Sequence, residues 1–169
     1  MKTLNQYIQE KLIINKDYRE VKIVVKSFDE LRKIIEDRYD ELGAGTKQNP
    51  IDFNDIDVSN IDSFCYNNPL FDKGIFEGIK FKYIDISGWN VSNVTNMGSM
   101  FFACEKLESV GDISKWDVSN VTNMSNMFFA CEKLESIGDI SKWDVSNVTI
   151  QYDMFYNCPI KNEYKPKFK

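Results

Sequence analysis

The sequence predicts an α+β repeat fold, a short solenoid of about four coils of 27 residues with an N-terminal helix-strand-helix cap. Residues 90–116 and 117–143 are near copies of one another, since only four of 27 positions differ. One such unit cannot bury its apolar face alone, so a fixed period of this size indicates stacked units. The motif [DN]-V-S-N-[VI] marks the coils at intervals of 33, 27 and 27 residues, beginning at Asp57, Asn90, Asp117 and Asp144.

The first 50 residues differ from the repeats and predict a cap. Residues 4–14 have apolar side chains at the spacing of an amphipathic helix, and the β-branched segment 21–25 predicts a short strand. Ser27 begins a capping box, which predicts a second helix ending at Gly43. We expect residues 1–50 to close the open end of the stack, because terminal repeats expose apolar surface.

Each coil contains two kinds of apolar rhythm. The segment 121–131 (VTNMSNMFFAC) has apolar residues three or four apart and predicts a short helix, whereas 134–145 has them every third residue and predicts a short extended stretch that turns corners of the coil. Six extra residues in the first interval are placed near 67–78, where Pro and Gly break the pattern. The predicted domain organisation is therefore a cap, a solenoid over 51–160, and a basic tail over 161–169, which serves either as a short cap or as a mobile end.

Charge is distributed unevenly along the chain. The formal charge is +1 over residues 1–50, -9 over 51–160 and +3 over 161–169, and the repeats contain no arginine. Nucleic-acid binding relies on clustered Lys and Arg, so the acidic repeats argue against a direct nucleic-acid partner. No apolar run has the length of a signal peptide or of a membrane span, which predicts a cytoplasmic protein, or a cell-surface one if the chain is a fragment of a longer array.

Equal positions of successive coils form ladders of identical side chains, and each ladder has a structural and a functional interpretation. The cysteines at 104, 131 and 158 favour buried thiols, with a metal site or a regulated disulfide as the alternatives. The carboxylates at 85, 112 and 139 favour turns over calcium binding. The tryptophans at 89, 116 and 143 favour packing, with the indole N-H bonded, over stacking on sugars or bases. The Ser-Asn pairs at 92–93, 119–120 and 146–147 favour helix caps.

No catalytic constellation is present in the sequence. With no histidine the chain lacks Ser-His and Cys-His pairs, and no phosphate-binding loop or dinucleotide-binding glycine pattern occurs. We therefore expect a protein that is not an enzyme and that requires no cofactor or metal.

The units WDVSNVTNMSNMF and F-x-x-C-x-x-L-x-x-I resemble the BspA-like class of bacterial leucine-rich repeats, often described as surface proteins or as a mycoplasma repeat of unknown function. The resemblance covers about 57–158, and the first 50 residues are similar to the N-terminal segment of small members from bacterial and phage genomes. The resemblance implies a right-handed leucine-rich-repeat solenoid that works as a protein-binding surface. Larger secreted relatives act as adhesins, but these residues predict no signal sequence, anchor or long array, so the resemblance does not lead us to expect an adhesin.

Three functions remain open. The first is a non-enzymatic module that binds a protein partner through its acidic repeat surface. The second is a phage or mobile-element inhibitor that occupies the basic groove of a host nucleic-acid-binding factor. The third is a metal protein or enzyme that works through its carboxylate ladders. The candidate binding residues are Tyr83, Glu108, Asp112, Lys115, Glu135, Asp139 and Lys142, and specificity is expected where the copies differ, at the insertion, at Tyr83 and after Val148.

Overall fold

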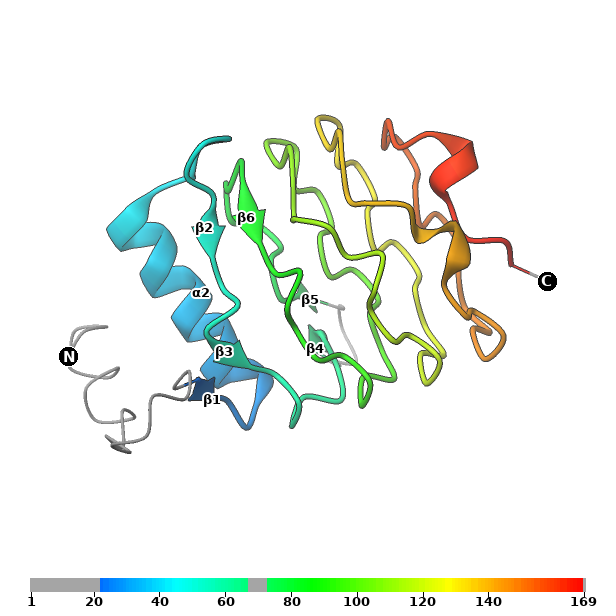
Figure 1. Cartoon of the computed structure of the whole chain (residues 1–169), viewed down its shortest axis with the longest axis horizontal. Coiled ribbons are helices and arrows are strands. Elements are labelled where there is room, and N and C mark those ends of the chain that lie inside the picture. The colour runs from blue at the N-terminus through cyan, green and yellow to red at the C-terminus, as the bar shows by residue number, and fades with distance from the viewer. Residues whose placement is uncertain (1–21, 67–72, 169) are drawn as a thin grey trace.

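The computed structural model describes residues 22–66 and 73–168. Its coils follow one another along the long axis, with helix α2 across one end and the C-terminus near the other (Figure 1). The elements are short, as stacked coils require: β1 Ile23–Val24, α2 Phe28–Leu42, β2 Ile51–Asp52, β3 Ile56–Asp57, β4 Cys65–Tyr66, β5 Lys73–Gly74, β6 Ile84–Asp85, and the 3-10 helices η1 Ile140–Lys142 and η2 Asn162–Tyr164.

The predicted helix after Ser27 is confirmed as α2. The Ser27 hydroxyl accepts a hydrogen bond from the Glu30 amide, and Gly43 ends the helix with a φ of 73°. One face of α2 is buried, through Leu31, Ile34 and Ile35. The strand predicted at 21–25 corresponds to β1, which pairs in parallel with β3, whereas the helix predicted at 4–14 lies outside the described residues.

Successive coils pair in parallel at the period of the sequence repeat. Asn123 forms one bridge with Asn96 and another with Ile150, each 27 residues away. Ser109 and Ser136 form an equivalent bridge at another position of the coil. Identical positions therefore lie directly above one another, although the assignment to the leucine-rich-repeat class and the domain boundaries at 50 and 160 stay predictions.

The short helix predicted at 121–131 is wrong, because this segment forms overlapping turns. The amides of Met127 and Phe129 bond back three residues, whereas the intervening amides bond to the next coil. Asn126 and Ala130 have φ values of 56° and 54°, in the left-handed region that an α-helix does not visit. Backbone hydrogen bonds from one coil to the next thus replace the hydrogen bonds that an α-helix would form within the segment.

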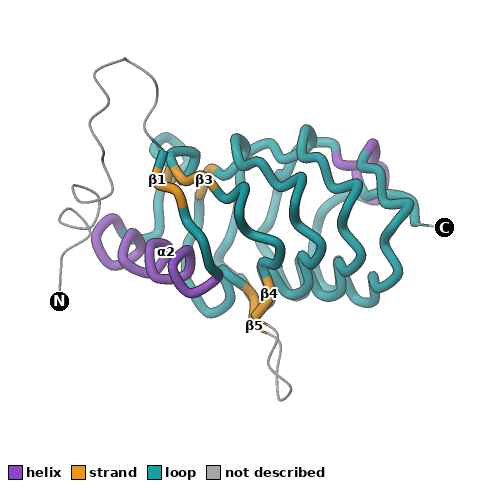
Figure 2. Tube along the Cα trace, turned by 90° about the horizontal axis from the view of Figure 1, so that it is seen from below, coloured by secondary structure: helices purple, strands orange, loops and turns teal. Residues whose placement is uncertain are grey.

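The segment 134–145, predicted as a short extended stretch that turns corners of the coil, contains both features. Ser136 forms a parallel bridge, and the chain then turns through η1, whose N-cap is the carboxylate of Asp139. Within the insertion predicted near 67–78, β5 pairs antiparallel with the preceding strand β4 at the edge of the stack (Figure 2). Residues 67–72 lie outside the described part of the chain.

The core is a continuous column of side chains at repeat-equivalent positions. Phe101 and Phe128 stack with ring centroids 5.3 Å apart, and Phe76 and Phe155 extend the stack at either end. The tail belongs to this column as a short cap, since Ile160 and Pro166 are buried. Within the described residues, no helix is both long enough and apolar enough to cross a membrane.

The tryptophan ladder and the cysteines at 104 and 131 are buried, as predicted, whereas Cys158 is only partly buried. Cys104 and Cys131 are free thiols whose Sγ atoms donate to carbonyls of the preceding coil, and burial raises their pKa. The indoles of Trp89 and Trp143 donate to carbonyls of Phe53 and Ile113 at 2.9 and 3.2 Å. Trp116 departs from the prediction, because its buried indole N-H has no hydrogen-bond partner among the described residues.

The helix caps predicted for the Ser-Asn pairs are wrong, since the structure places no helix after them. The side-chain amide of Asn120 instead donates to the Ser92 carbonyl at 2.8 Å, and that of Asn147 donates to the Ser119 carbonyl at 2.7 Å. Each asparagine thus joins its coil to the preceding one, and Asn93 makes the same contact with Ser59.

Candidate binding groove

Four of the seven predicted binding residues line two adjoining cavities on one side of the stack. Tyr83, Glu108 and Glu135 line the first cavity, and Glu135 and Asp139 line the second. Glu135 is common to both, so the cavities form one groove that crosses the coils. The other three predicted residues, Asp112, Lys115 and Lys142, are not among those that line either cavity.

The backbone register of the coils brings the groove residues together. The amide of Glu108 donates to the Lys82 carbonyl at 2.7 Å, and the amide of Glu135 donates to the Glu108 carbonyl at 3.0 Å. Tyr83 pairs with Ser109 in a parallel bridge, which places its side chain beside that of Glu108. Positions 27 residues apart therefore lie one above the other, and a glutamate that is repeated in the sequence becomes a row of carboxylates in space.

The first cavity has a volume of about 170 Å³ and lies over the early coils. Lys47 and Pro50 line it from the segment after α2, and Asp85 lines it from β6. The second cavity, of about 310 Å³, extends toward the C-terminal tail, where Ile160 and Tyr164 line it.

The groove is acidic. Its lining contains the carboxylates of Asp85, Glu108, Glu135 and Asp139, against the single ammonium group of Lys47. These groups give the lining a formal charge of -3. Walls of one charge sign concentrate the potential in a groove and raise the local concentration of oppositely charged ligands.

Tyr83 and Glu108 form the central polar contact of the groove. The Tyr83 hydroxyl donates a hydrogen bond to Oε2 of Glu108. This bond, then burial, then the negative charges of Glu108 and Glu135 raise the pKa of Tyr83. The phenol consequently stays protonated at neutral pH and orients the Glu108 carboxylate.

The two aspartates of the groove are held by local hydrogen bonds. Burial would raise the pKa of Asp85, but bonds from Ser87 and Asn54 outweigh it and lower the pKa. Bonds from the hydroxyl and the amide of Ser141 lower the pKa of Asp139. Both side chains are thus negatively charged at neutral pH, as the predicted turn carboxylates require.

The aspartates of the ladder pack closely against glycines of the following coil. A Cβ on Gly111 would lie 2.5 Å from Oδ1 of Asp85, and one on Gly138 would lie 1.9 Å from Oδ1 of Asp112. Both glycines have positive φ, 82° and 81°. Each carboxylate therefore lies directly against the backbone of the following coil.

Within the described residues, no group of three or more His, Cys, Asp or Glu side chains could hold a metal ion. The carboxylates of the ladder accept hydrogen bonds from serine amides two residues ahead, as in Asp112 with Ser114 at 3.0 Å. An Asp-to-serine-amide turn satisfies the carboxylate locally and directs it along its own coil.

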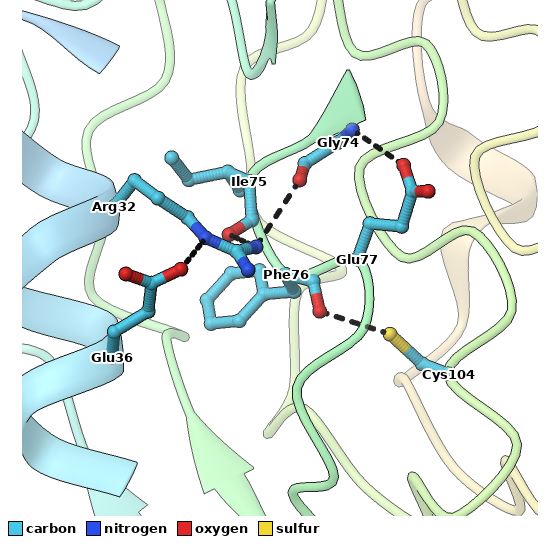
Figure 3. A network of polar contacts seen from close by, with 7 residues as sticks. All are labelled: Arg32, Glu36, Gly74, Ile75, Phe76, Glu77 and Cys104. Atoms are coloured by element: carbon cyan, nitrogen blue, oxygen red, sulfur yellow. Dashed lines mark hydrogen bonds and ion pairs between the residues drawn. The ribbon is translucent and has the colours of Figure 1, made fainter. Parts of the chain in front are cut away.

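A larger cavity of about 430 Å³ lies between α2 and residues 78–80. Its most prominent charged residue, Arg32, donates to Oε1 of Glu36 at 2.7 Å and to the Ile75 carbonyl at 2.7 Å (Figure 3). Because these bonds already engage the guanidinium, this network joins the cap to the first coil and presents less free charge than the acidic groove.

Sequence reasoning missed several residues of the groove. Lys47, Pro50 and Tyr164 carry no repeat signal, because they lie outside the repeated units. Asp85 was recognisable as a member of the aspartate ladder and lies two residues from Tyr83 in the chain, but its place in the same cavity as Lys47 and Pro50 was not readable from the period.

The comparisons with known proteins identify a family. The family model described as "Mycoplasma protein of unknown function, DUF285" matches residues 70–167, more than half of the chain. No curated protein and no solved structure matches the chain. The matched range contains both near-identical coils and most of the groove, and the chain belongs to the family of Mycoplasma proteins of unknown function, DUF285.

Proposed function

We propose that the chain is a non-enzymatic protein-interaction module whose acidic groove binds a basic, extended segment of a partner protein. The observation that carries this proposal is the row of four carboxylates along one groove, opposed by a single lysine. The resemblance of the coils to BspA-like leucine-rich repeats, in which the concave or lateral surface of a solenoid serves for binding, supports the same function.

The geometry of the groove favours an extended ligand. Glu108 and Glu135 occupy equivalent positions of adjacent coils, and paired strands lie about 4.8 Å apart. Lysine or arginine side chains along an extended peptide alternate in direction, so that every second one meets this side of the groove. Tyr83 and Tyr164 add aromatic surface near its two ends, on which the stems of such side chains can pack.

The test compares two glutamates of the same coil. Glu108 lines the groove, whereas Glu105 is exposed and lines neither cavity. We expect Glu108→Lys to weaken binding of a fluorescently labelled lysine-rich decapeptide about tenfold, because a close charge pair becomes a repulsion. The control Glu105→Lys introduces the same change in net charge and should alter the dissociation constant less than twofold. Fluorescence anisotropy at two salt concentrations measures both the affinity and its electrostatic origin.

Equal weakening by the two substitutions would show that net charge alone attracts the peptide and would reject the groove. Absence of binding by the unmodified protein would reject a basic ligand altogether. A photo-crosslinking amino acid in place of Tyr83, used in cells of the source organism, would then recover the natural partner for identification.

The strongly acidic repeats also suit a second class of partner, a protein that binds nucleic acid. A formal charge of -9 over residues 51–160 suits a protein with a basic, nucleic-acid-binding groove. We propose such a factor as the second candidate. Competition by duplex DNA for the factor, lost in Glu108→Lys but retained in Glu105→Lys, would distinguish it from other basic partners.

A further inference from the structure

The overlapping turns of adjacent coils form a column of hydrogen bonds that all point the same way. Four amides in 97–103 donate to the following coil, and four in 124–130 do the same, at distances between 2.8 and 3.0 Å. In these two stretches the N-H groups face the C-terminal end of the stack and the carbonyls face the N-terminal end. The donors are Met97, Ser99, Phe101, Ala103, Met124, Asn126, Phe128 and Ala130.

Aligned peptide dipoles add, as they do in an α-helix, and leave partial positive charge at the N-H end and partial negative charge at the carbonyl end. The carbonyl end of the stack is capped by a cation. Nη1 of Arg32 donates to the carbonyls of Ile75 and Gly74 at 2.7 and 3.4 Å (Figure 3). Helix α2 thus supplies both the cover and the complementary charge.

At the N-H end the tail covers the core through Ile160 and Pro166 but does not bond to the row of amides. The positions 27 residues after the four donors of 124–130 are four residues of the last coil, and their backbone amides are the equivalent donors there. None of them donates a hydrogen bond to an acceptor in 22–66 or 73–168. These amides belong to Gln151, Asp153, Phe155 and Asn157.

Exposed aromatic and basic side chains surround this row of amides. Tyr152 and Tyr156 are 59% and 60% exposed. Lys161, Lys165 and Lys167 follow in the tail, and the ammonium of Lys165 lies 5.0 Å from the centroid of the Phe155 ring. Three lysines of the tail are matched by the carboxylates of Asp153, Glu163 and Glu132, the last of which accepts a hydrogen bond from the Asn157 side chain at 2.7 Å. The side-chain charges therefore balance, and the unbonded N-H groups are what favours an acceptor at this end.

A second copy of the chain does not fit here end to end. If two copies met through their C-terminal coils, N-H donors would face N-H donors. If the C-terminal coil of one copy met the carbonyl end of another, α2 would stand in the way, because it covers that end (Figure 1). A ligand must instead bring acceptors. We propose that the open end of the last coil, residues 150–157, binds an extended acidic segment of a partner protein, with its carbonyl and carboxylate oxygens on the free amides.

The test removes one amide hydrogen without changing the charge. Gln151 does not have a positive φ, and Ile150 before it forms a β-bridge with Asn123, the extended conformation that a residue before proline favours. Because the Gln151 amide bonds to nothing in the described structure, Gln151→Pro should retain the thermal stability of the matched control Gln151→Ala. The probe is a fluorescently labelled decapeptide of glutamate.

We expect the unmodified protein and Gln151→Ala to bind the probe with equal affinity and Gln151→Pro to bind it about tenfold more weakly, since a hydrogen bond to a charged acceptor is lost. Tyr152→Ala should also weaken binding, and it leaves every backbone donor in place. Failure of the unmodified protein to bind the probe, or equal affinities of Gln151→Pro and Gln151→Ala, would overturn the proposal. Because Glu108→Lys leaves this end unchanged, it should not weaken the acidic probe, which separates this surface from the groove.

Discussion

At the scale of single residues, contact between a carboxylate and a glycine of the next coil determines how closely the coils approach. The Gly138 backbone lies against Oδ1 of Asp112, at a φ of 81°. Gly78 has a similar φ of 77° but no atom within 4 Å of where a Cβ would lie. Substitutions at the two glycines therefore distinguish two losses of stability, one from a left-handed backbone conformation and one from the collision of an added Cβ with the Asp112 carboxylate.

We predict that Gly138→Ala lowers the free energy of unfolding by about 3 kcal/mol, because it adds a collision to the backbone strain. Gly78→Ala should cost about 1 kcal/mol, from conformation alone. Urea unfolding followed by circular dichroism measures both. Equal costs for the two substitutions would show that the coils can separate to accommodate the methyl group.

Much of the residue-level pattern was readable from the sequence. The period identified the buried cysteines and tryptophans, because a side chain repeated every 27 residues stacks on its own copy. The unbonded indole of Trp116 was not readable, since Trp116 and Trp143 occupy equivalent positions in near-identical coils. A pattern that is the same at both positions cannot predict a bond that forms at only one of them.

At the scale of elements, the turn segment shows where periodicity is ambiguous. Apolar residues at spacings of three and four suit an α-helix, but overlapping turns place Met124, Met127 and Phe128 in the core equally well. Two acceptors compete for each backbone amide of this segment, a carbonyl three residues earlier in the segment and a carbonyl of the next coil. A pattern of apolar side chains contains no information about that choice, so the helix prediction failed although the core residues were correct.

The junction between α2 and the first coil gives a second prediction. Arg32 is 12% exposed and donates to backbone carbonyls, whereas Lys33 is 60% exposed and, among the described residues, pairs only with Asp37 on the same helix. Arg32→Met should lower the free energy of unfolding by about 2 kcal/mol, since it leaves the Ile75 carbonyl without its donor, whereas the Gly74 carbonyl still accepts from the Glu77 amide.

Lys33→Met serves as the control for Arg32→Met, because it also removes one positive charge from α2. A surface ion pair within a helix contributes little, so this control should cost less than about 0.5 kcal/mol. Chemical denaturation of the two variants side by side provides the comparison. A cost for Arg32→Met as small as that of the control would mean that water replaces the guanidinium without penalty.

At the scale of the whole molecule, the repeated aspartates make stability depend on pH. Hydrogen bonds from the hydroxyl and the amide of the serine two residues ahead lower the pKa of Asp57, Asp112, Asp117 and Asp139. A carboxyl group whose pKa is lower in the folded state than in the unfolded state contributes stability above its unfolded pKa, and this contribution is lost as the pH falls through the folded pKa.

We therefore predict that the free energy of unfolding decreases as the pH falls below about 4, the ordinary pKa of an aspartate. Urea unfolding at pH 6, 4 and 3 tests this. Asp139→Asn removes one titrating group and should show a smaller decrease over the same interval than the unmodified protein does. An identical pH dependence of the two proteins would contradict a contribution from this carboxylate.

The equivalent bridges of successive coils have a consequence for inheritance. Asn123 meets Asn96 on one side and Ile150 on the other through the same backbone pairing, so the front of a coil complements the back of its own copy. Recombination between the two gene segments that encode 90–116 and 117–143 would add or delete one 27-residue unit, and the remaining coils would meet through the same backbone pairing. The number of coils can therefore change in a single genetic event, and the length of the groove would change with it.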